Sequence, residues 1–409
     1  MYTLITTLLT MYGIARPVLG ALDPTSMQQR LSAGAPILGT YKDDSGVLAS
    51  WMTSLSDNTT LVSLNIPGTH DTCAWNYTGL LPEVYNTQSS PIFDQLNGGI
   101  RFLDLRIGAN DGKVMLYHAD ALLSDTAQIV DVLYGLYYFL DAHPSETIIA
   151  SIKVDHGVES DPTLQQLLYD QFTTSPTNDY WVQGEDLVTL GAARHKIVLF
   201  RRYNLIPSLS PIGIPVAQGW TDNAADFVIR DNADLSVFVE DLYEIDNSTQ
   251  PMSTIIKTKF DAFTTHLDDA NLSANKTQLF VSFASGSGMG GGTEVFPKGL
   301  AVGNSTANVT GVNGLARPWL VQHKGNRFGV VLFDFFDSEP GLVEAVLGIP
   351  PVTSANSTAS TATSSGNATG TATGISGSQS AKYSSSSIST LSRLPWLQLL
   401  PPVAIPFMF

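Results

Sequence analysis

Two histidines in short polar segments supply the groups that acid–base chemistry needs. His70 and Asp71 lie in the segment IPGTHDT, and His118 lies in the segment LYHAD. A histidine side chain titrates at about pH 6.5, so one imidazole can accept a proton while another donates one. These segments therefore predict a pair of catalytic histidines.

Charged residues farther along the chain predict the kind of substrate. Arg106, Lys153 and Arg202 could bind an anion that carries two or more charges. Asp104 and Asp334 could orient the two imidazoles and favour their charged forms. This combination of histidines, cations and carboxylates matches phosphoryl transfer through a charged, in-line transition state.

Two pairs of polar residues indicate that these side chains gather in one place. Asp104 and Arg106 are two residues apart, as are Asp241 and Tyr243, so the members of each pair face the same side of a strand. Charged side chains that point into a folded interior are costly unless they are paired and hydrogen-bonded. Any single one could form a structural ion pair, but together they indicate a polar site.

Other kinds of site lack their signatures in the sequence. The absence of a GxSxG segment disfavours an acyl-transfer hydrolase. There is no His-x-x-x-His segment and no dense carboxylate cluster, so we expect neither a metal ion nor a cofactor. The segment Gly286–Gly292 contains the letters of GxGxxG, but TEVFP follows it where a dinucleotide-binding fold needs a helix. We expect a mobile loop there.

Short apolar runs predict the fold that positions these residues. Eight of them have the length and the Val, Ile, Leu and Phe content of parallel strands that are buried on both faces. Helical patterns separate several runs, most clearly at Asp125–Ala142 and also near Leu164–Phe172 and Ser253–Leu267. The pattern predicts an α/β fold, a single distorted (β/α)8 barrel of the TIM type, with catalytic groups at the carboxyl ends of its strands. A doubly wound sheet is the alternative, but no phosphate-binding glycine turn follows the first run. The eight runs are Leu61–Ile66, Ile100–Ile107, Val114–His118, Thr147–Val154, Lys196–Arg202, Ser236–Tyr243, Gln278–Ala284 and Arg327–Phe335.

The composition limits the partners of the protein. The chain has 409 residues, 43% of them hydrophobic, which is enough for one large domain. A net charge of −16 argues against a nucleic-acid partner and opposes adsorption to anionic bilayers, so any lipid substrate would have to be bound locally. Cys73 is the single cysteine, and we expect it to be a buried side chain rather than a reactive thiol.

Both ends of the sequence resemble processing signals. Residues 1–21 suit a signal peptide, because an apolar run precedes small residues. The catalytic domain is expected over 45–350, followed by a Ser/Thr/Gly-rich linker at 353–393 and an apolar tail at 394–409. The linker and the tail suit a GPI-anchor signal, with a tethered amphipathic end as the alternative. We therefore expect a secreted, extracellular glycoprotein that is anchored at the cell surface. The nine sequons are Asn58, Asn76, Asn247, Asn271, Asn275, Asn304, Asn308, Asn356 and Asn367.

Seven segments of the chain resemble the bacterial phosphatidylinositol-specific phospholipase C family, within the X-domain superfamily of phospholipase C-like phosphodiesterases. The resemblance covers roughly residues 50–345 and implies a barrel with a lipid phosphodiesterase site. The segments are Trp51-Met52, IPGTHDT at 66–72, GIRFLDLRIG at 99–108, LYHAD at 116–120, HPSETIIASIK at 143–153, LGAARHKIVLFRRY at 190–203 and RFGVVLFDFF at 327–336.

The resemblance implies a role for each acid–base residue. His70 resembles the general base that takes the proton from the inositol 2-hydroxyl, and Asp334 resembles its orienting carboxylate. His118 resembles the general acid that protonates the diacylglycerol oxygen, supported by Asp104 and assisted by Asp71. The implied reaction is intramolecular, because the 2-hydroxyl attacks phosphorus and gives a cyclic phosphodiester that water can later open.

The resemblance also implies how the substrate is held. Arg106 resembles the arginine that stabilises the phosphate. Calcium-dependent members place acidic ligands at the positions of Arg106 and Lys153, and the cations found here would repel calcium and replace its charge, so we expect a metal-independent enzyme. The implied partner is a phosphoinositide or GPI lipid at a membrane surface, and we expect a monomer. The residues that match headgroup-holding positions are Lys153, Arg202, Asp241 and Tyr243.

Two other functions stay open at the level of sequence. One is a metal-dependent glycerophosphodiester or sphingolipid phosphodiesterase on the same barrel, which EDTA would inhibit. The other is a catalytically silent, surface-anchored binding protein, although this chain keeps both histidines and the arginine. The long Pro/Gly-rich stretch Leu205–Asn223 replaces a short connection near the rim, so the choice of substrate is open as well.

Overall fold

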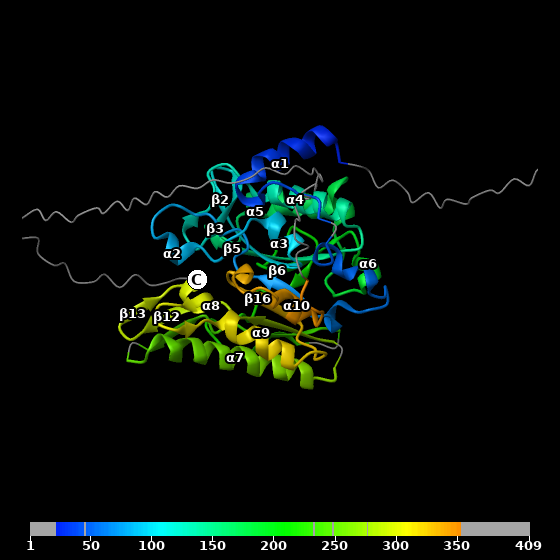
Figure 1. Cartoon of the computed structure of the whole chain (residues 1–409). Helices are drawn as coiled ribbons and strands as arrows, with labels where there is room; N and C mark the ends of the chain where they lie inside the picture. The colour runs from blue at the N-terminus through cyan, green and yellow to red at the C-terminus, as the bar shows by residue number, and fades with distance from the viewer. Residues whose placement is uncertain (1–21, 45, 232–233, 248, 276, 353–409) are drawn as a thin grey trace, which may run out of the picture. The chain divides into compact units, whose positions relative to one another are not determined.

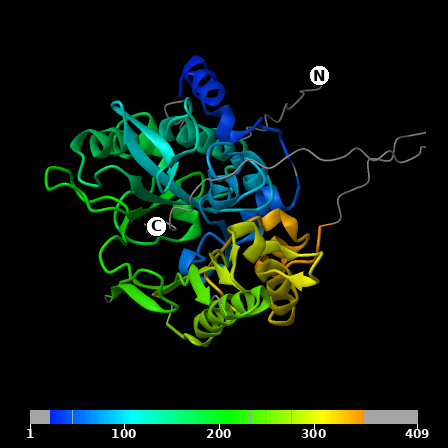
Figure 2. The same cartoon turned by 90° about the vertical axis from the view of Figure 1, so that its left-hand side faces the viewer.

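Parallel strands form a barrel in the computed structural model, which describes residues 22–44, 46–231, 234–247, 249–275 and 277–352 (Figure 1). Their hydrogen-bonded order is β7-β6-β5-β2-β1-β16-β11-β9. In Figure 2 the colours run once around the barrel, which brings the last strand, β16, beside the first, β1. The parallel strands are β1 (Ile66–Thr69), β2 (Phe102–Asn110), β5 (Ile148–His156), β6 (Ile197–Arg202), β7 (Ile214–Pro215), β9 (Ser236–Glu240), β11 (Gln278–Phe283) and β16 (Val330–Phe333).

The distorted (β/α)8 barrel is confirmed, but it is an open one. β8 (Phe227–Asp231) pairs antiparallel with β9 at one edge of the sheet. The path of hydrogen-bonded strands ends at β7 on one side and at β8 on the other, so within the described residues a seam separates them. The first half of the expected strand Leu61–Ile66 is the 3-10 turn η2 (Leu61–Ser63), and β1 begins only at Ile66.

The expected third barrel strand was assigned wrongly. Its residues form β3 (Lys113–His118), which pairs antiparallel with β2 and, at its other end, with β4 (Ala121–Leu122). The two residues Asp111 and Gly112 connect β2 to β3 with φ values of 48° and 72°, and such a turn folds the chain directly back into a hairpin. The missing place in the barrel belongs to β7, which lies inside the stretch Leu205–Asn223.

The glycine-rich segment Gly286–Gly292 is not the loop that we expected. Its β12 (Ser287–Gly290) pairs parallel with β10 (Glu244–Asn247) and antiparallel with β13 (Thr293–Val295). A Cβ atom at Gly288 would lie 2.0 Å from the carbonyl oxygen of Ile245, so only glycine lets these strands approach. The helix α8 (Pro297–Val302) follows β13.

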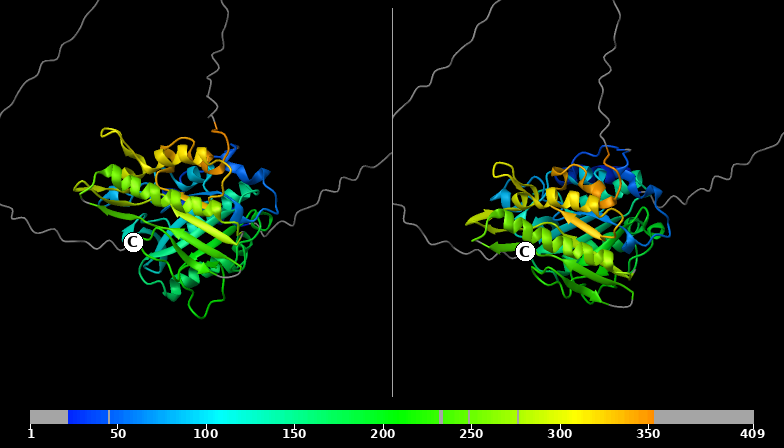
Figure 3. Two further views of the ribbon diagram at one scale, coloured as in Figure 1. Left: turned by 90° about the horizontal axis from the view of Figure 1, so that it is seen from below. Right: turned by 60° about the horizontal axis from the view of Figure 1, so that its bottom comes forward.

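Helices cover the outer face of the barrel strands. The expected helices are present as α4 (Ile129–Ala142), α5 (Pro162–Thr173) and α7 (Met252–Leu272), and Figure 3 shows α7 lying along the outside of the sheet. α1 (Pro24–Leu38) precedes the expected start of the domain and packs on α4. The other described elements are η1 (Leu48–Ser54), α2 (Pro82–Tyr85), α3 (Ile92–Asn97), η3 (Thr177–Tyr180), α6 (Leu190–Ala193), β14 (Gly303–Asn304), β15 (Val309–Thr310), α9 (Val312–Gln322), η4 (Phe336–Ser338) and α10 (Leu342–Leu347).

Alternate strand residues separate the barrel interior from the helix-facing layer. Leu103 and Leu105 belong to one buried cluster with the helices, whereas Phe102 and Phe200 belong to a second cluster, their rings 5.6 Å apart. Because side chains alternate along a strand, Asp104 and Arg106 share the side of Phe102. The same face is therefore apolar at the start of β2 and polar toward its end.

Several expectations lie outside the described residues. They are the signal peptide at 1–21, the linker at 353–393 and the tail at 394–409, so these assignments stay predictions. Within the described part of the chain, no helix is both long enough and apolar enough to cross a membrane. Cys73 is buried, as expected.

Candidate active site

The polar ends of three neighbouring strands place three cations at one level of the barrel. The register of β2, β5 and β6 sets Arg106 beside Lys153 and Lys153 beside Arg202. Below them, the carboxylate of Asp104 lies 3.1 Å from Nε of Arg106 and 3.2 Å from Nη1 of Arg202. Cations on adjacent strands repel one another, so this arrangement suits an anionic ligand.

Three carboxylates enclose the guanidinium group of Arg106. Its Nε atom lies 3.1 Å from Asp104 and 3.5 Å from Asp71, and its Nη1 atom lies 3.3 Å from Asp155. Asp155 also binds Nζ of Lys153 at 2.7 Å. Arg106 and Lys153 hold the pKa of Asp155 well below its usual range, although burial opposes them. The guanidinium is thus fixed in position and in charge.

His70 follows β1 and lies between an acid and a guanidinium. Its Nδ1 atom is 2.8 Å from Oδ1 of Asp334, the residue that follows β16, and its Nε2 atom is 2.7 Å from Nη2 of Arg106. An arginine can only donate, so Nε2 must accept and Nδ1–H must donate to Asp334. This neutral tautomer leaves the Nε2 lone pair directed at the Arg106 guanidinium, and an unprotonated Nε2 is what a general base requires.

His118 ends the hairpin strand β3 and faces His70. The two imidazole rings are 6.1 Å apart, nearly perpendicular to each other. Nδ1–H of His118 donates to the carbonyl oxygen of Tyr85 at 2.7 Å, and the same atom lies 3.3 Å from Oδ2 of Asp71. Asp71 adopts φ of 42°, a left-handed conformation that turns the chain directly after His70. The structure therefore places Asp71 against His118, whereas Asp104 bonds Arg106 and Arg202.

A tryptophan joins Arg202 to Asp241 beside the seam. The Arg202 guanidinium carbon lies 3.6 Å from the centre of the Trp220 ring, and Nε1–H of Trp220 donates to Asp241 at 2.9 Å. The hydroxyl of Tyr243 donates to Asp222 at 2.6 Å. Trp220 and Asp222 come from the stretch that also contains β7. A planar cation stacked on an aromatic face is held at little entropic cost.

Comparison with known proteins shows which family this arrangement is similar to. Residues 64–203, which run from before β1 to the residue after β6, match the family model of phosphatidylinositol-specific phospholipase C, X domain. These residues are similar to an X domain of that family. The resemblance found in the motifs is confirmed, and the match supports a phosphodiesterase of the phospholipase C type.

Curated relatives and solved structures agree with the X domain. The 1-phosphatidylinositol phosphodiesterase of Staphylococcus aureus is 27% identical over 288 residues, which cover 66% of this chain and 86% of that protein. Its counterpart in Listeria monocytogenes is 35% identical over 158 residues, 36% of this chain and 47% of that protein. A crystal structure of a pentafluoro-Phe form of the S. aureus phospholipase C covers 74% of this chain and 98% of its own, with 23% identity and a TM-score of 0.60, which supports the barrel fold.

Burial sets the protonation of the candidate site. Burial and, next to it, the charge of Arg106 lower the pKa of His70 well below the usual value and that of His118 to about 4. Burial also raises the pKa of Asp71 well above its usual range, although Arg106 opposes the rise. Both imidazoles are therefore neutral in the unliganded protein near pH 7, and Asp71 can hold a proton beside His118.

The structure brings all ten expected site residues to the carboxyl-terminal edge of the barrel and adds three that the sequence analysis missed. Asp155 lies two residues after Lys153 on the same strand, so the spacing rule used for Asp104 and Arg106 could have found it. Trp220 and Asp222 lie in an irregular stretch, where no periodicity predicts their position. The expected residues are His70, Asp71, Asp104, Arg106, His118, Lys153, Arg202, Asp241, Tyr243 and Asp334.

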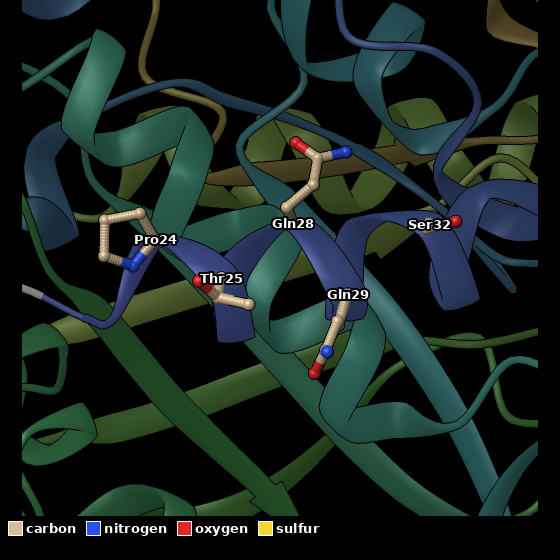
Figure 4. A pocket seen from close by; sticks show the side chains of 5 residues that line it. All are labelled: Pro24, Thr25, Gln28, Gln29 and Ser32. Carbon is tan, nitrogen blue, oxygen red and sulfur yellow. The ribbon is translucent and has the colours of Figure 1, made fainter.

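Two further observations concern other possible sites. In the part of the chain that the structure describes, no group of three or more His, Cys, Asp or Glu side chains has the arrangement of a metal site. A hollow on the outer face of α1 is lined by uncharged side chains, which offer no acid, base or nucleophile of their own at neutral pH (Figure 4). Its lining residues are Pro24, Thr25, Gln28, Gln29 and Ser32.

Proposed function

We propose that the protein cleaves phosphatidylinositol or a GPI-type lipid between the phosphate and the diacylglycerol, by acid–base catalysis of two histidines and without a metal ion. Relatives named 1-phosphatidylinositol phosphodiesterase support this substrate. The observation that carries the mechanism is the placement of His70 and His118, 6.1 Å apart between ring centres, with the Arg106 guanidinium bound to His70.

Each proton has an assigned donor and acceptor in the proposed reaction. Nε2 of His70 takes the proton of the inositol 2-hydroxyl, whose oxygen attacks phosphorus while the bond from phosphorus to the diacylglycerol oxygen breaks. The anionic substrate favours the charged form of His118, which gives its Nε2 proton to that leaving oxygen, and the Asp71 carboxylate beside it stabilises the charged ring. The products are diacylglycerol and a cyclic inositol phosphate, which water can open by the reverse use of the two histidines.

The cations and the polar residues near the seam hold the substrate. Arg106 neutralises the charge that develops on the phosphate, and Asp334 and Asp104 orient His70 and Arg106. The residues that we assign to the ring hydroxyls and the phosphate of the headgroup are Lys153, Arg202, Asp241 and Tyr243. Arg106 lies among three carboxylates, which supports the proposal that a guanidinium does the work of a divalent ion.

Phosphorus NMR on the purified full-length protein tests this function. The protein is incubated with phosphatidylinositol vesicles, with and without EDTA, and we expect a cyclic phosphodiester resonance to appear equally in both samples. Loss of turnover in EDTA would instead favour a metal-dependent glycerophosphodiester or sphingolipid enzyme. Vesicle binding without turnover would favour a silent binding protein, and an acyclic phosphate formed from the start would contradict the attack by the 2-hydroxyl.

We propose in addition that the protein is secreted as a monomer and is held at the cell surface by a GPI anchor. The support is the sequence pattern at 1–21 and 353–409 together with the density of sequons. Mass spectrometry of the mature protein from its native cells checks both processed ends and the glycans. A mature chain that keeps residues 1–21 and 394–409 would contradict the proposal.

A further inference from the structure

A buried ion pair lies behind the site, between the end of β9 and the helix α7. Nζ of Lys259 is 2.8 Å from Oε1 of Glu240, and neither side chain has any exposure to solvent. Two charges are removed from water only at a large cost in free energy, so such a pair needs further hydrogen bonds to be tolerated. Those further bonds indicate what the pair holds.

The ion pair holds the backbone of Leu242 from both sides. The N–H of Leu242 donates to Oε1 of Glu240 at 3.1 Å, and its carbonyl oxygen accepts from Nζ of Lys259 at 2.8 Å. Leu242 lies between Asp241 and Tyr243, the two residues assigned to the headgroup. β9 ends at Glu240 and β10 begins at Glu244, so these three residues lie outside both strands. Side chains from outside the barrel interior therefore fix this connection.

The charge of Lys259 also reaches the site. Adjacent residues of an extended chain point to opposite sides, and accordingly Glu240 bonds α7 while Asp241 accepts from Trp220 in the site. The Lys259 ammonium lowers the pKa of Asp241 and that of Asp334, although burial raises both. The cation thus favours the ionised form of two site carboxylates that it does not contact.

We propose that Glu240 and Lys259 are positioning residues for headgroup recognition: their ion pair fixes the Leu242 backbone so that Asp241 and Tyr243 face the inositol ring. This inference rests on the proposed function. It assigns a role to two residues that touch neither the substrate nor the reacting atoms. Their loss must weaken binding of the headgroup more than it slows the chemical step.

Three variants separate positioning from mere stability. Glu240→Gln keeps an oxygen that can accept from Leu242 and from Lys259, whereas Glu240→Met and Lys259→Met remove the bonds to the backbone. With a water-soluble inositol phosphodiester as substrate, we expect KM and the inhibition constant of myo-inositol to rise about tenfold in both Met variants, with kcat within about threefold of the wild type. Glu240→Gln should stay within about threefold in all three constants, as a conservative replacement that keeps the hydrogen bonds.

Another buried pair supplies the matched control. Arg101 and Glu146 lie 3.0 Å apart with no solvent exposure. Arg101 precedes β2, at the opposite end of the strand from the site, and its guanidinium donates to the carbonyl oxygens of Ile100 and of Ala49 in η1. The variant Arg101→Met/Glu146→Gln should lower the unfolding temperature and leave KM unchanged. If that variant does not fold, Arg30→Met, which removes the partly exposed pair with Asp131, replaces it. Equal KM values in the wild type and in both Met variants would overturn the proposal, as would a fall in kcat alone.

A readout without turnover keeps this test distinct from that of the proposed function. Nε1–H of Trp220 donates to Asp241, so its indole resonance reports the position of Asp241 in the resting protein. We expect this resonance to move in Lys259→Met and to stay in place in Glu240→Gln, even if the protein hydrolyses no inositol lipid. An unmoved resonance in a turnover-competent protein would defeat the positioning role alone, whereas a wild type without turnover would defeat the proposed function alone.

Discussion

The Nε2 atom of His70 accepts a hydrogen bond from the Arg106 guanidinium, 2.7 Å away. The lone pair of the proposed base is therefore occupied by the group that we propose to bind the phosphate. A phosphodiester that enters the site offers the guanidinium a charged acceptor in place of a neutral imidazole. Substrate binding then releases the base for the hydroxyl that it deprotonates, so base strength and substrate occupancy are coupled through Arg106.

The first prediction separates the base from the acid by the leaving group. His70→Ala should lower kcat by at least about a thousandfold with either an alkyl or an aryl leaving group, because the nucleophile needs its base in both cases. His118→Ala should cost as much with the alkyl group but much less with an aryl group, which leaves without protonation. Steady-state rates on the two substrates check this. His156→Ala, a partly exposed histidine outside the proposed machinery, should match the wild type. Equal losses in the two catalytic variants on the aryl substrate would contradict the assignment.

The second prediction concerns the charge and the shape of Arg106. Arg106→Ala should lower kcat/KM by about a thousandfold or more, because it removes charge stabilisation from a buried site. Arg106→Lys should recover only a small part of this, since one ammonium cannot bind Asp104, Asp155 and His70 in the directions of a guanidinium. Arg230→Ala, at a surface ion pair on β8, is the control. A nearly active Lys variant would show that charge alone suffices.

The third prediction follows from the lowered pKa of His118. Burial and Arg106 hold it at about 4, so the ring should stay neutral in the free protein down to about pH 4, where an exposed histidine would protonate at about 6.5. A bound anion favours the charged ring, so the pKa must rise when an inositol phosphate occupies the site. NMR titration of the His118 ring with and without myo-inositol phosphate measures both values. A pKa near 6.5 in the free protein, or no rise with the ligand, would contradict the account.

The fourth prediction concerns the bridge made by Trp220. Trp220→Phe keeps a ring over Arg202 but loses the hydrogen bond to Asp241, so KM should rise about fivefold to tenfold. Trp220→Ala loses the stacking as well and should raise KM further. The inhibition constant of myo-inositol should rise in the same order, from the wild type to Trp220→Phe to Trp220→Ala. Trp319→Phe, on α9, is the control, and unchanged KM values in both Trp220 variants would rule out a role in headgroup binding.

Periodicity predicted most of the barrel because the buried strands are apolar on both faces. Thr147–Val154, Lys196–Arg202 and Gln278–Ala284 match β5, β6 and β11 within two residues at either end. The hairpin strand β3 was predicted as a barrel strand because it is as apolar as the barrel strands are. The Asp111-Gly112 turn before it was the available signal of an antiparallel return.

The site was predictable where strand ends carry it and unpredictable elsewhere. Arg202 ends β6, and the parallel register places Lys153 and Arg106 beside it on β5 and β2, so the topology alone gathers the three cations. Trp220 and Asp222 depend on how an irregular stretch folds over the rim, and no local pattern specifies that. The pairing of Glu240 with Lys259 joins residues 19 positions apart through a helix that packs on the strand, which only tertiary structure reveals.

In the part of the chain that the structure describes, no backbone hydrogen bonds pair β7 with β8. Contacts between side chains connect the two edges of the sheet there. Arg202, Trp220 and Asp241 form the chain of contacts that crosses this gap. A headgroup bound by both Arg202 and Asp241 would connect the two edges of the sheet. We therefore expect headgroup binding to slow amide hydrogen exchange in β7 and β8, including at residues that the headgroup does not contact. Because the sheet is open at this place, the bound headgroup would stabilise the strands on both sides of the gap.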